Sequence, residues 1–271
     1  MSKFSVLMSV YRREQPQFLR EALESLFCQT RLPDEVVLVK DGPLTEELEA
    51  VIADFSNRFG ERLHLLPLAE NVGLGRALNA GLSACRYELV ARMDSDDISA
   101  PDRFEKLMNA MAEYPEVDVM GSWIDEFATN PEEVISVRKS PEHHAEICKL
   151  ATSRSPMNHV SVLFRKESVL RVGGYQHFYL LEDYYLWCRM IAAGARFANL
   201  SEPLVHVRCG EDMFRRRGGW RYAQSEYRLF RYMYQNGMIG LGRFLFNASA
   251  RFVVRISPTW FRQWVYLKLL R

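Results

Sequence analysis

The stretch YELVARMDSDDISAPDRF, residues 87–104, joins a short apolar run to a dense group of carboxylates. The run LVARM is interrupted only by Arg92, and such a run is typical of a strand that is buried on both faces. Asp94, Asp96 and Asp97 follow, and three carboxylates within four residues repel one another. The stretch therefore predicts a buried strand with a binding site for a positively charged partner at its end.

Strand-like and helix-like patterns alternate through the first half of the chain. The strand-like runs are residues 4–11, 35–42, 63–68 and 87–93, and the helix-like runs are residues 16–30, 45–59, 73–84 and 100–114. This alternation predicts an α/β fold whose mostly parallel, Rossmann-like sheet is covered by helices on both faces. Ligands bind where the parallel strands of such a sheet end, so we expect Tyr11, Asp41 and Asp94 to lie together there.

The second half of the chain is less regular. Residues 117–127 and 159–166 are strand-like, and residues 180–194 have helical spacing with Gly194 as the stop. No run of 18 apolar residues occurs, so we expect no transmembrane helix, and we expect no signal peptide. The five cysteines are widely spaced without a Cys-x-x-Cys motif, so we expect reduced thiols in a reducing, cytoplasmic compartment.

Charge is distributed unevenly along the chain. From His206 onward there are 13 Lys and Arg against 3 Asp and Glu, a net charge of +10, whereas the rest has a net charge of −9. The last basic residues, which alternate with apolar and aromatic ones, are Arg243, Arg251, Arg255, Arg262, Lys268 and Arg271. This pattern predicts an interfacial segment on the membrane surface, with Trp260 and Trp264 at headgroup level. A terminal helix packed on the core is the alternative, and we expect no nucleic-acid partner because no binding motif occurs.

The aspartates that follow the LVARM run have two interpretations. As helix caps, Asp97 or Ser99 would accept hydrogen bonds from the following helix, but Asp94 would remain unexplained. As ligands, the carboxylates would hold Mg²⁺ or Mn²⁺, with a substrate's phosphates completing the coordination shell. An EF-hand is excluded, because Ile98 stands at the fifth position and no glycine follows.

The segment NVGLGRALNAGL, residues 71–82, has three glycines in a helical frame. It lacks the Gly-Lys-Ser/Thr of a Walker motif and the third glycine of a dinucleotide fingerprint. It is therefore either a phosphate-binding turn or a helix that packs closely on the sheet through small residues. Arg76 is the residue of this segment that we would expect to touch a ligand.

Glu182 and Asp183 stand at the start of a helix-like run, where acids also stabilise the helix dipole. The aromatic residues around them are Phe178, Tyr179, Tyr184, Tyr185 and Trp187. A carboxylate among aromatic rings is well placed to hold a sugar and to accept a proton from its hydroxyl. His159 and His206 are expected to be packed or surface residues, although His206 with Arg208 could neutralise a diphosphate.

Taken in order, SVY, VKDG, NVGLGRALNAGL, RMDSDD and LLEDYYLW closely resemble the motifs of family 2 glycosyltransferases, which are inverting enzymes with the GT-A fold. The resemblance covers residues 4–206, and the chain looks most like enzymes of bacterial O-antigen and amylovoran-type exopolysaccharide assembly. It implies a GT-A catalytic domain over residues 1–206, with a nucleotide-binding half at 1–100 and an acceptor-binding half at 101–206. Residues 207–271 would form a helical, basic, membrane-associating extension.

The resemblance also assigns roles to single residues. The positions that it matches to nucleotide contacts are Val10, Tyr11, Asp41, Asn71, Arg76, Asp94 and Asp96. Asp96, with Asp94 beside it, matches the carboxylate that binds Mn²⁺ or Mg²⁺ and bridges to the diphosphate of a UDP-sugar. Asp183 matches the general base, and Glu182 and Trp187 would contact the acceptor.

The resemblance thus implies a metal-dependent transferase that moves galactose or glucose from a UDP-sugar to a lipid-diphosphate-linked saccharide. Such an enzyme would work peripherally at the inner face of a bacterial cytoplasmic membrane. The chain departs from the family where Lys40 precedes Asp41, since two aspartates are commoner there, and we expect this to be tolerated. The alternative is a sugar-binding module of the same fold that has lost catalysis. The presence of both Asp96 and Asp183 does not favour it. A sugar nucleotidyltransferase would need a glycine-rich loop that SVYRREQPQ lacks.

Overall fold

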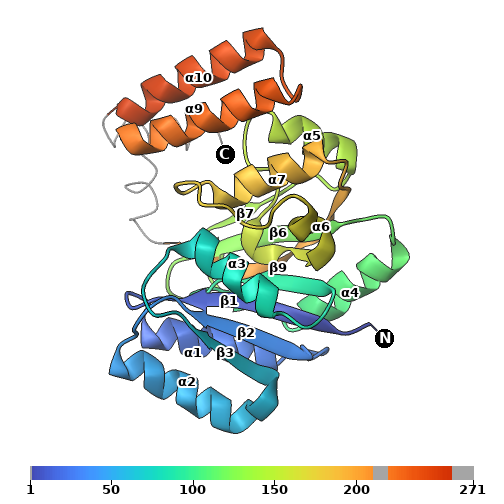
Figure 1. The fold of residues 1–271 in the computed structure, drawn as a ribbon. Helices are drawn as coiled ribbons and strands as arrows, with labels where there is room; N and C mark the ends of the chain where they lie inside the picture. The colour runs from blue at the N-terminus through green and yellow to red at the C-terminus, as the bar shows by residue number, and fades with distance from the viewer. Residues whose placement is uncertain (1, 210–218, 258–271) are drawn as a thin grey trace.

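The computed structural model describes residues 2–209 and 219–257, and Figure 1 shows the arrangement of its helices and strands. The strands are β1 (Phe4–Val10), β2 (Glu35–Lys40), β3 (Leu63–Pro67), β4 (Leu89–Met93), β5 (Ile98–Ser99), β6 (Val119–Phe127), β7 (Ser136–Arg138), β8 (Leu163–Arg165) and β9 (Phe197–Arg208). The helices are α1 (Pro16–Phe27), α2 (Glu46–Phe59), α3 (Leu74–Ala84), α4 (Arg103–Glu113), α5 (His144–Ala151), α6 (Lys166–Arg171), α7 (Glu182–Ala192), α9 (Trp220–Gln235) and α10 (Leu241–Ile256). The 3₁₀ turns are η1 (Gly60–Arg62) and η2 (His159–Ser161).

The strands form one sheet in the order β3-β2-β1-β4-β8-β6-β9-β5, with β7 paired to β6. β1 is parallel to β2 and to β4, and β2 is parallel to β3, which confirms the predicted parallel half. Beyond β4 the sheet is mixed, because β8 is antiparallel to β4 and β6 while β9 is parallel to β6. The sheet is therefore parallel where helices connect its strands, as the alternation of patterns predicts.

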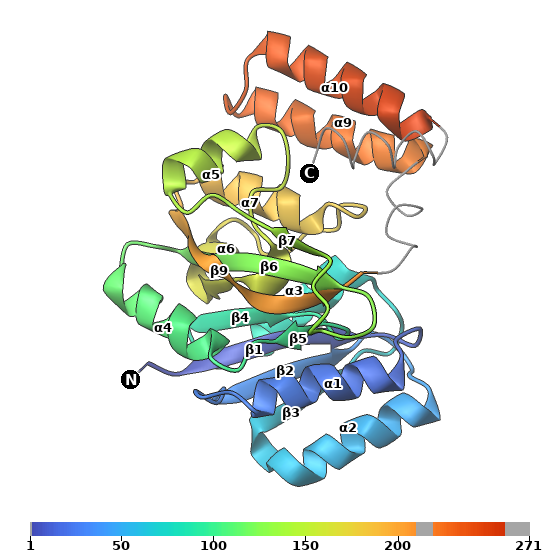
Figure 2. The same ribbon diagram turned by 180° about the vertical axis from the view of Figure 1, so that it is seen from behind.

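Helices cover both faces of this sheet (Figures 1 and 2). On one face α1, α2 and α4 pack through buried residues that include Leu23, Phe55 and Phe104. On the other face α3, α5, α6 and α7 pack through residues that include Leu78 and Leu186. Burial on both faces explains why the sequences of β1 and β2 are almost continuously apolar.

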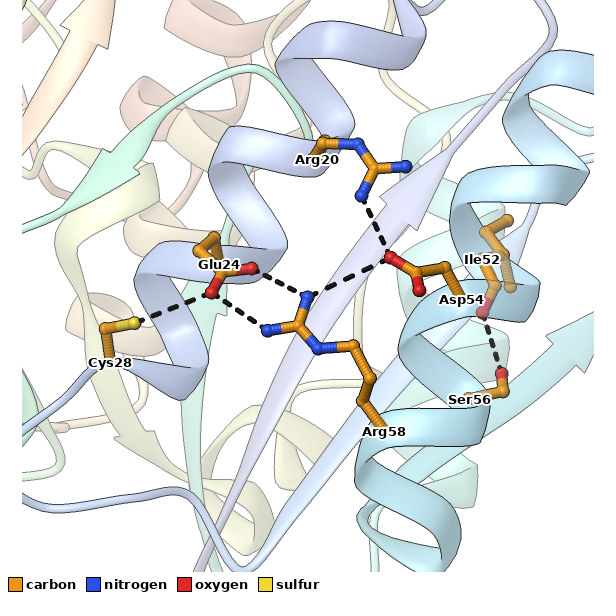
Figure 3. A network of polar contacts seen from close by, with 7 residues as sticks. All are labelled: Arg20, Glu24, Cys28, Ile52, Asp54, Ser56 and Arg58. Carbon is orange, nitrogen blue, oxygen red and sulfur yellow. Dashed lines mark hydrogen bonds and ion pairs between the residues drawn. The ribbon is translucent and has the colours of Figure 1, made fainter.

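Charged side chains on the surface also connect α1 to α2, as Figure 3 shows. Arg58 donates two hydrogen bonds of 2.9 Å to the Glu24 carboxylate, and Arg20 donates one of 2.9 Å to Asp54. The hydrogen bonds from Arg58 hold the pKa of Glu24 below its usual value. All four side chains are exposed, so water and salt screen these pairs, and we expect them to contribute little to stability.

The second half of the chain differs from the sequence prediction in one place. Residues 159–166, predicted as one strand, are divided between η2 and β8. In η2 the Ser161 hydroxyl lies 3.0 Å from the carbonyl oxygens of Ser122 and Asn158, and residue 166 already begins α6. The strand predicted at 117–127 is confirmed as β6, and the helix predicted at 180–194 is confirmed as α7.

The helices α9 and α10 form a hairpin on the far side of α7 from the sheet (Figures 1 and 2). α9 packs against α7 through Tyr184, Leu229 and Phe230. Arg251 of α10 donates a 2.8 Å hydrogen bond to the carbonyl oxygen of Ser153, so the described tail packs on the core as the alternative interpretation predicts. The tail residues that lie outside the described residues are Trp260, Arg262, Trp264, Lys268 and Arg271. No helix in the described part of the chain is long and apolar enough to cross a membrane.

Candidate active site

The carboxyl ends of β1, β2 and β4 lie side by side, as the alternation of strands and helices predicts. Lys40 at the end of β2 pairs with Val10 at the end of β1, and Met93 of β4 pairs with Met8. The residues that come next on the three strands are Tyr11, Asp41 and Asp94. The three predicted site residues therefore leave the sheet at one edge.

The predicted nucleotide contacts differ in their accessibility. Tyr11 is 40% exposed, and Asn71 and Arg76 are also exposed. The Val10 side chain is completely buried, and its carbonyl oxygen accepts a 2.8 Å hydrogen bond from the backbone N–H of Asp41. A bound nucleotide would thus reach the side chains of Tyr11, Asn71 and Arg76, but not that of Val10.

Asp41 holds the loop that precedes α3. Its carboxylate accepts hydrogen bonds from the backbone N–H groups of Val72 at 2.7 Å and Gly73 at 3.1 Å. It also accepts a 3.0 Å hydrogen bond from the side-chain amide of Asn71. Because Asp41 is only 4% exposed, its first effect is to fix this loop, and with it Asn71, at the strand edge.

The glycines of residues 71–82 serve mainly close packing. A Cβ atom on Gly75 would lie 2.9 Å from Cγ of Glu182, and one on Gly81 would lie 2.5 Å from Cδ1 of Leu7. Gly73 is needed for another reason, since its φ of +84° lies in the left-handed region at the start of α3. At Gly75 and Gly81 the structure agrees with the packing interpretation of this segment, and Gly75 brings α3 against the start of α7.

Asp94 is fixed from inside the fold. It forms an ion pair with Arg92, which is completely buried in β4. Arg103, also completely buried, donates hydrogen bonds to the carbonyl oxygens of Arg92 at 2.6 Å and Val160 at 2.8 Å. Burial alone would raise the pKa of Asp94, but the charge and the hydrogen bond of Arg92, together with smaller contributions from His159 and Arg103, outweigh it and hold that pKa below its usual value. The Asp94 carboxylate is therefore ionised and held in one place.

Asp96 is a carboxylate whose charge the surrounding side chains do not compensate. Burial, followed by the negative charges of Asp94 and Glu14, raises the pKa of Asp96 to about 7. Glu14 is held nearby because its carboxylate accepts a 2.5 Å hydrogen bond from the hydroxyl of Ser95. Within the described residues Asp96 forms no ion pair with a basic side chain, so a divalent cation would relieve the repulsion and fits this site. Across 2–209 and 219–257, no three His, Cys, Asp or Glu side chains form a metal site by themselves.

Asp97 and Ser99 do not cap the following helix, contrary to the capping interpretation. α4 begins at Arg103, directly after Asp102, and the chain before it forms the short strand β5, which pairs with β9. The Asp97 carboxylate accepts a 2.9 Å hydrogen bond from the backbone N–H of Arg208 in β9. Asp97 therefore accepts a hydrogen bond from a neighbouring strand and not from the N-terminus of a helix.

His206 and Arg208 reach the same edge from β9. His206 is 27% exposed, and its Nδ1 lies 2.7 Å from Oδ1 of Asp125 on β6. Arg208 is 9% exposed and donates a 2.5 Å hydrogen bond to Glu21. Arg208 is therefore engaged within the fold, which does not favour the prediction that it neutralises a diphosphate. Asp125, which orients the His206 ring, cannot be recognised from the sequence, because nothing distinguishes it from other polar residues of a strand.

The first turn of α7 contains Glu182 and Asp183, and both side chains are partly exposed. Burial, with the charge of Asp183, raises the pKa of Glu182 to about 7. Trp187, one turn later, is completely buried in the core. This position does not favour the predicted contact between Trp187 and an acceptor, because a bound sugar would reach only the first turn of the helix.

A packed pair of side chains, His159 and Tyr175, interacts electrostatically with acids of both groups. Nε2 of His159 lies 2.9 Å from the hydroxyl oxygen of Tyr175. Burial, followed by the charge of Arg92, lowers the pKa of His159 to about 4, so its ring is neutral at pH 7. His159 and Tyr175 both feel the negative charges of Asp94 and Asp183. These two carboxylates therefore lie within electrostatic range of one packed pair, and His159 is packed as expected.

Comparison with known proteins identifies relatives that cover nearly the whole chain. The model of the family described as glycosyl transferase family 2 matches residues 5–174. An Escherichia coli protein named UDP-Gal:alpha-D-GlcNAc-diphosphoundecaprenol beta-1,3-galactosyltransferase is 40% identical over 269 residues, or 99% of this chain and 97% of that protein. The amylovoran biosynthesis glycosyltransferase AmsE of Erwinia amylovora is 42% identical over 265 residues, or 98% of each protein.

Among solved structures, S. aureus TarS 1–349 in complex with UDP-GlcNAc has a similar fold. Its TM-score is 0.70 at 19% sequence identity, and the match covers 98% of this chain and 76% of the TarS chain. At this identity the likeness concerns the fold alone. It confirms the predicted GT-A-like α/β architecture with a helical C-terminal region.

Proposed function

This chain belongs to glycosyl transferase family 2 and is a glycosyltransferase, and from this premise we propose that it moves a hexose from a UDP-sugar to a lipid-diphosphate-linked saccharide. The observation that supports the proposal is that Asp41 and Asp94 leave the sheet at one edge, while the start of α7, with Glu182 and Asp183, lies close to the start of α3, which follows the loop that Asp41 holds. Such an edge suits a reaction in which a diphosphate leaves and a hydroxyl loses its proton.

The nucleotide would lie along the residues that follow β1 and β2. Tyr11 offers an exposed ring on which a base can stack, and Asn71 offers amide groups for polar edges. Arg76, on the first turn of α3, offers a positive charge for a phosphate. The name of the E. coli relative includes UDP-Gal, which supports UDP as the nucleotide.

A Mn²⁺ or Mg²⁺ ion would be held by Asp96, with Asp94 beside it. The raised pKa of Asp96 supports this assignment, because a carboxylate among like charges gains most from a bound cation. When bound, the ion would neutralise charge on the leaving diphosphate. Arg92 keeps Asp94 ionised and holds it in place next to Asp96.

Asp183 would act as the general base. It accepts the proton of the acceptor hydroxyl, whose oxygen bonds to the anomeric carbon while the bond from that carbon to the UDP oxygen breaks. Because attack occurs on the face opposite UDP, the configuration at the anomeric carbon inverts. A general base typically contributes about 10²–10⁴-fold to the rate. Glu182, beside the base, would hold the acceptor sugar.

The name of the E. coli relative favours galactose as the donor sugar, before glucose, and GlcNAc-diphosphoundecaprenol as the kind of acceptor. The name of AmsE favours a place in exopolysaccharide or O-antigen assembly. Residues 1–206 would form the catalytic domain, with the nucleotide bound by 1–100 and the acceptor by 101–206. Residues 207–271 would hold the enzyme peripherally at the inner face of the cytoplasmic membrane.

Release of UDP tests this proposal. Purified protein is incubated with Mn²⁺ and UDP-galactose, UDP-glucose or their N-acetyl forms, with and without a synthetic GlcNAc-diphosphate-lipid. We expect release that requires UDP-galactose, the metal ion and the acceptor together. Binding of UDP without release from any donor, with a wide panel of acceptors, would instead identify a nucleotide-binding module.

A further inference from the structure

One surface of the α9–α10 hairpin is apolar and aromatic and is exposed to solvent. Its residues are Trp220, Tyr227, Tyr234, Leu245, Phe246 and Val253, and we call it the hairpin face. Phe246 is 72% exposed and Trp220 is 61% exposed. Two ring contacts join the two helices. The ring centroids of Trp220 and Phe252 lie 5.5 Å apart, and so do those of Tyr234 and Phe244. The hairpin face therefore consists of side chains from both helices that the described part of the chain leaves exposed.

The charge around the hairpin face has one sign. Arg228 and Arg231 are exposed on α9; helical spacing places Arg231 beside Tyr227 and Tyr234, and Arg228 beside Arg231. Between residues 219 and 257 the one carboxylate side chain is that of Glu226, which is 6% exposed. The exposed surface of this hairpin is therefore aromatic, apolar and cationic, without an exposed acid.

The arginines of α10 point toward the protein instead. Arg255 donates two hydrogen bonds of 2.8 Å to Glu226, Arg251 bonds the carbonyl oxygen of Ser153, and Arg243 bonds Thr152. The sequence pattern predicts that these arginines face a membrane surface. In the structure they attach α10 to the protein, and apolar side chains face outward in their place.

We propose that the hairpin face docks on an anionic phospholipid bilayer, with Leu245 and Phe246 at the acyl boundary and Trp220 at headgroup level. The combination of outward apolar residues, aromatic rings and arginines is typical of helices that lie in the membrane interface. Arg228 and Arg231 would lie next to anionic headgroups, which complement their charge. Residues 258–271, PTWFRQWVYLKLLR, continue the same aromatic and basic composition directly after the hairpin, again without an acid.

A second copy of this chain is a poorer occupant of the hairpin face. In a twofold dimer the same patch meets itself, so Arg228 and Arg231 would face the arginines of the other copy without a compensating acid. A bilayer supplies both the apolar boundary and the negative charge. The inference rests on the proposed function in one respect, since docking would bring the strand-edge site to the membrane in which a lipid-linked acceptor lies.

Co-sedimentation of the full chain with vesicles tests the docking. Vesicles of phosphatidylglycerol with phosphatidylcholine are compared with vesicles of phosphatidylcholine alone, and no acceptor is added. We expect binding to the anionic vesicles, and a decrease on the order of tenfold or more in the Leu245→Ser, Phe246→Ser variant. The matched control is Val134→Ser, Ile135→Ser, which removes two exposed apolar side chains from another surface and should bind like wild type.

Charge reversal tests whether the arginines of α9 contribute to binding of the anionic surface. The Arg228→Glu, Arg231→Glu variant should lose anionic-vesicle binding by about fivefold or more per arginine. The control variant Arg62→Glu, Arg171→Glu reverses two exposed arginines outside the hairpin and should bind like wild type. High salt should weaken the binding of wild type to anionic vesicles, because it screens these charges.

Two results would overturn the docking. The first is vesicle binding that is absent in wild type or equal in wild type and both hairpin variants. The second is a concentration-dependent dimer, seen by light scattering, that Leu245→Ser, Phe246→Ser abolishes while no vesicle binding occurs. Transfer to a water-soluble, short-chain GlcNAc-diphosphate acceptor is measured without vesicles and should be equal in all these variants. Failure of that transfer in wild type would therefore count against the proposed function and not against the docking.

Discussion

The strand-end site and the α9–α10 hairpin treat buried charge in opposite ways. At the site Asp96 lies among like charges, and its pKa is raised to about 7. In the hairpin the Glu226 carboxylate accepts two hydrogen bonds from Arg255 and lies 3.7 Å from Arg251. Proteins seldom bury a charge without a partner. The comparison teaches that an uncompensated carboxylate marks a place for a ligand, whereas a compensated one marks a structural contact.

The largest effect should follow from Asp183→Asn at the site. This change removes the proposed base but keeps the shape of the side chain, so the transfer rate should fall by about 10²–10⁴-fold while UDP affinity stays the same. Initial rates of UDP release and calorimetric UDP binding measure the two quantities. Asp102→Asn, on the exposed start of α4, is the matched control and should keep full activity. A wild-type rate in Asp183→Asn would place the base elsewhere.

The next largest effect should be on stability, in the hairpin. Arg255→Gln leaves the buried Glu226 carboxylate without its principal partner, so the free energy of unfolding should fall by about 3 kcal/mol. Urea unfolding followed by circular dichroism measures this loss. Transfer to a soluble acceptor should be unchanged at temperatures where the variant is folded. Loss of transfer in the folded variant would mean that the hairpin contributes to the site itself.

A smaller effect is expected from pH on the metal-free protein. The folded state keeps a proton on Asp96 up to a pH of about 7, whereas an unfolded aspartate releases it near a pH of about 4. Between these values the folded state binds more protons, so the free energy of unfolding should fall as the pH rises. Glu182, with its pKa of about 7, adds to the same slope, whereas His159, whose pKa is lowered to about 4, partly opposes it because the unfolded ring stays protonated up to a pH of about 6.5.

Urea unfolding in EDTA across this pH range measures the slope. Asp96→Asn should make it shallower, and Mn²⁺ with UDP should do the same in wild type, because both remove the repulsion at Asp96. The same variant should lose the strengthening of UDP binding by Mn²⁺. An unchanged slope, together with UDP binding that still depends on Mn²⁺, would contradict both the charge state and the metal assignment of Asp96.

The smallest effect is expected from Arg58→Gln in the exposed network between α1 and α2 (Figure 3). Its side chain and that of Glu24 are exposed, so water already solvates both charges and the urea midpoint should hardly move. This variant is the surface counterpart of Arg255→Gln. If Arg58→Gln and Arg255→Gln lowered the free energy of unfolding equally, burial would not explain why one ion pair stabilises the fold more than the other.

The parallel half of the fold and the edge that forms the site can be predicted from short stretches of sequence. The apolar run LVARM predicts a buried strand that ends before Asp94, and the run EVVLVK predicts one that ends before Asp41. Both predictions succeed because an apolar run indicates burial without knowledge of the rest of the fold. The partners of these residues cannot be read in this way. Arg103 reaches β4 from α4, and Glu14 reaches Ser95 across 81 positions, so both contacts depend on the assembled fold.

Two of the places where the sequence misleads have a common cause. The start of α7 is rich in aromatic residues, but the ring of Trp187 turns inward and meets the rings of His159 and Phe197 instead of facing an acceptor. In α10 the alternation of arginine and apolar residues predicts an amphipathic helix correctly. The pattern does not say which side meets the protein, and Glu226 decides this by holding Arg255 inward.

The anomeric configuration of the transferred sugar gives the most direct test of a single displacement assisted by Asp183. Proton NMR of the product formed from UDP-α-galactose, Mn²⁺ and a GlcNAc-diphosphate-lipid reports it through the coupling between H1 and H2. We expect a β-linked galactose, and no product when EDTA replaces Mn²⁺. An α-linked product would contradict a single displacement at this site.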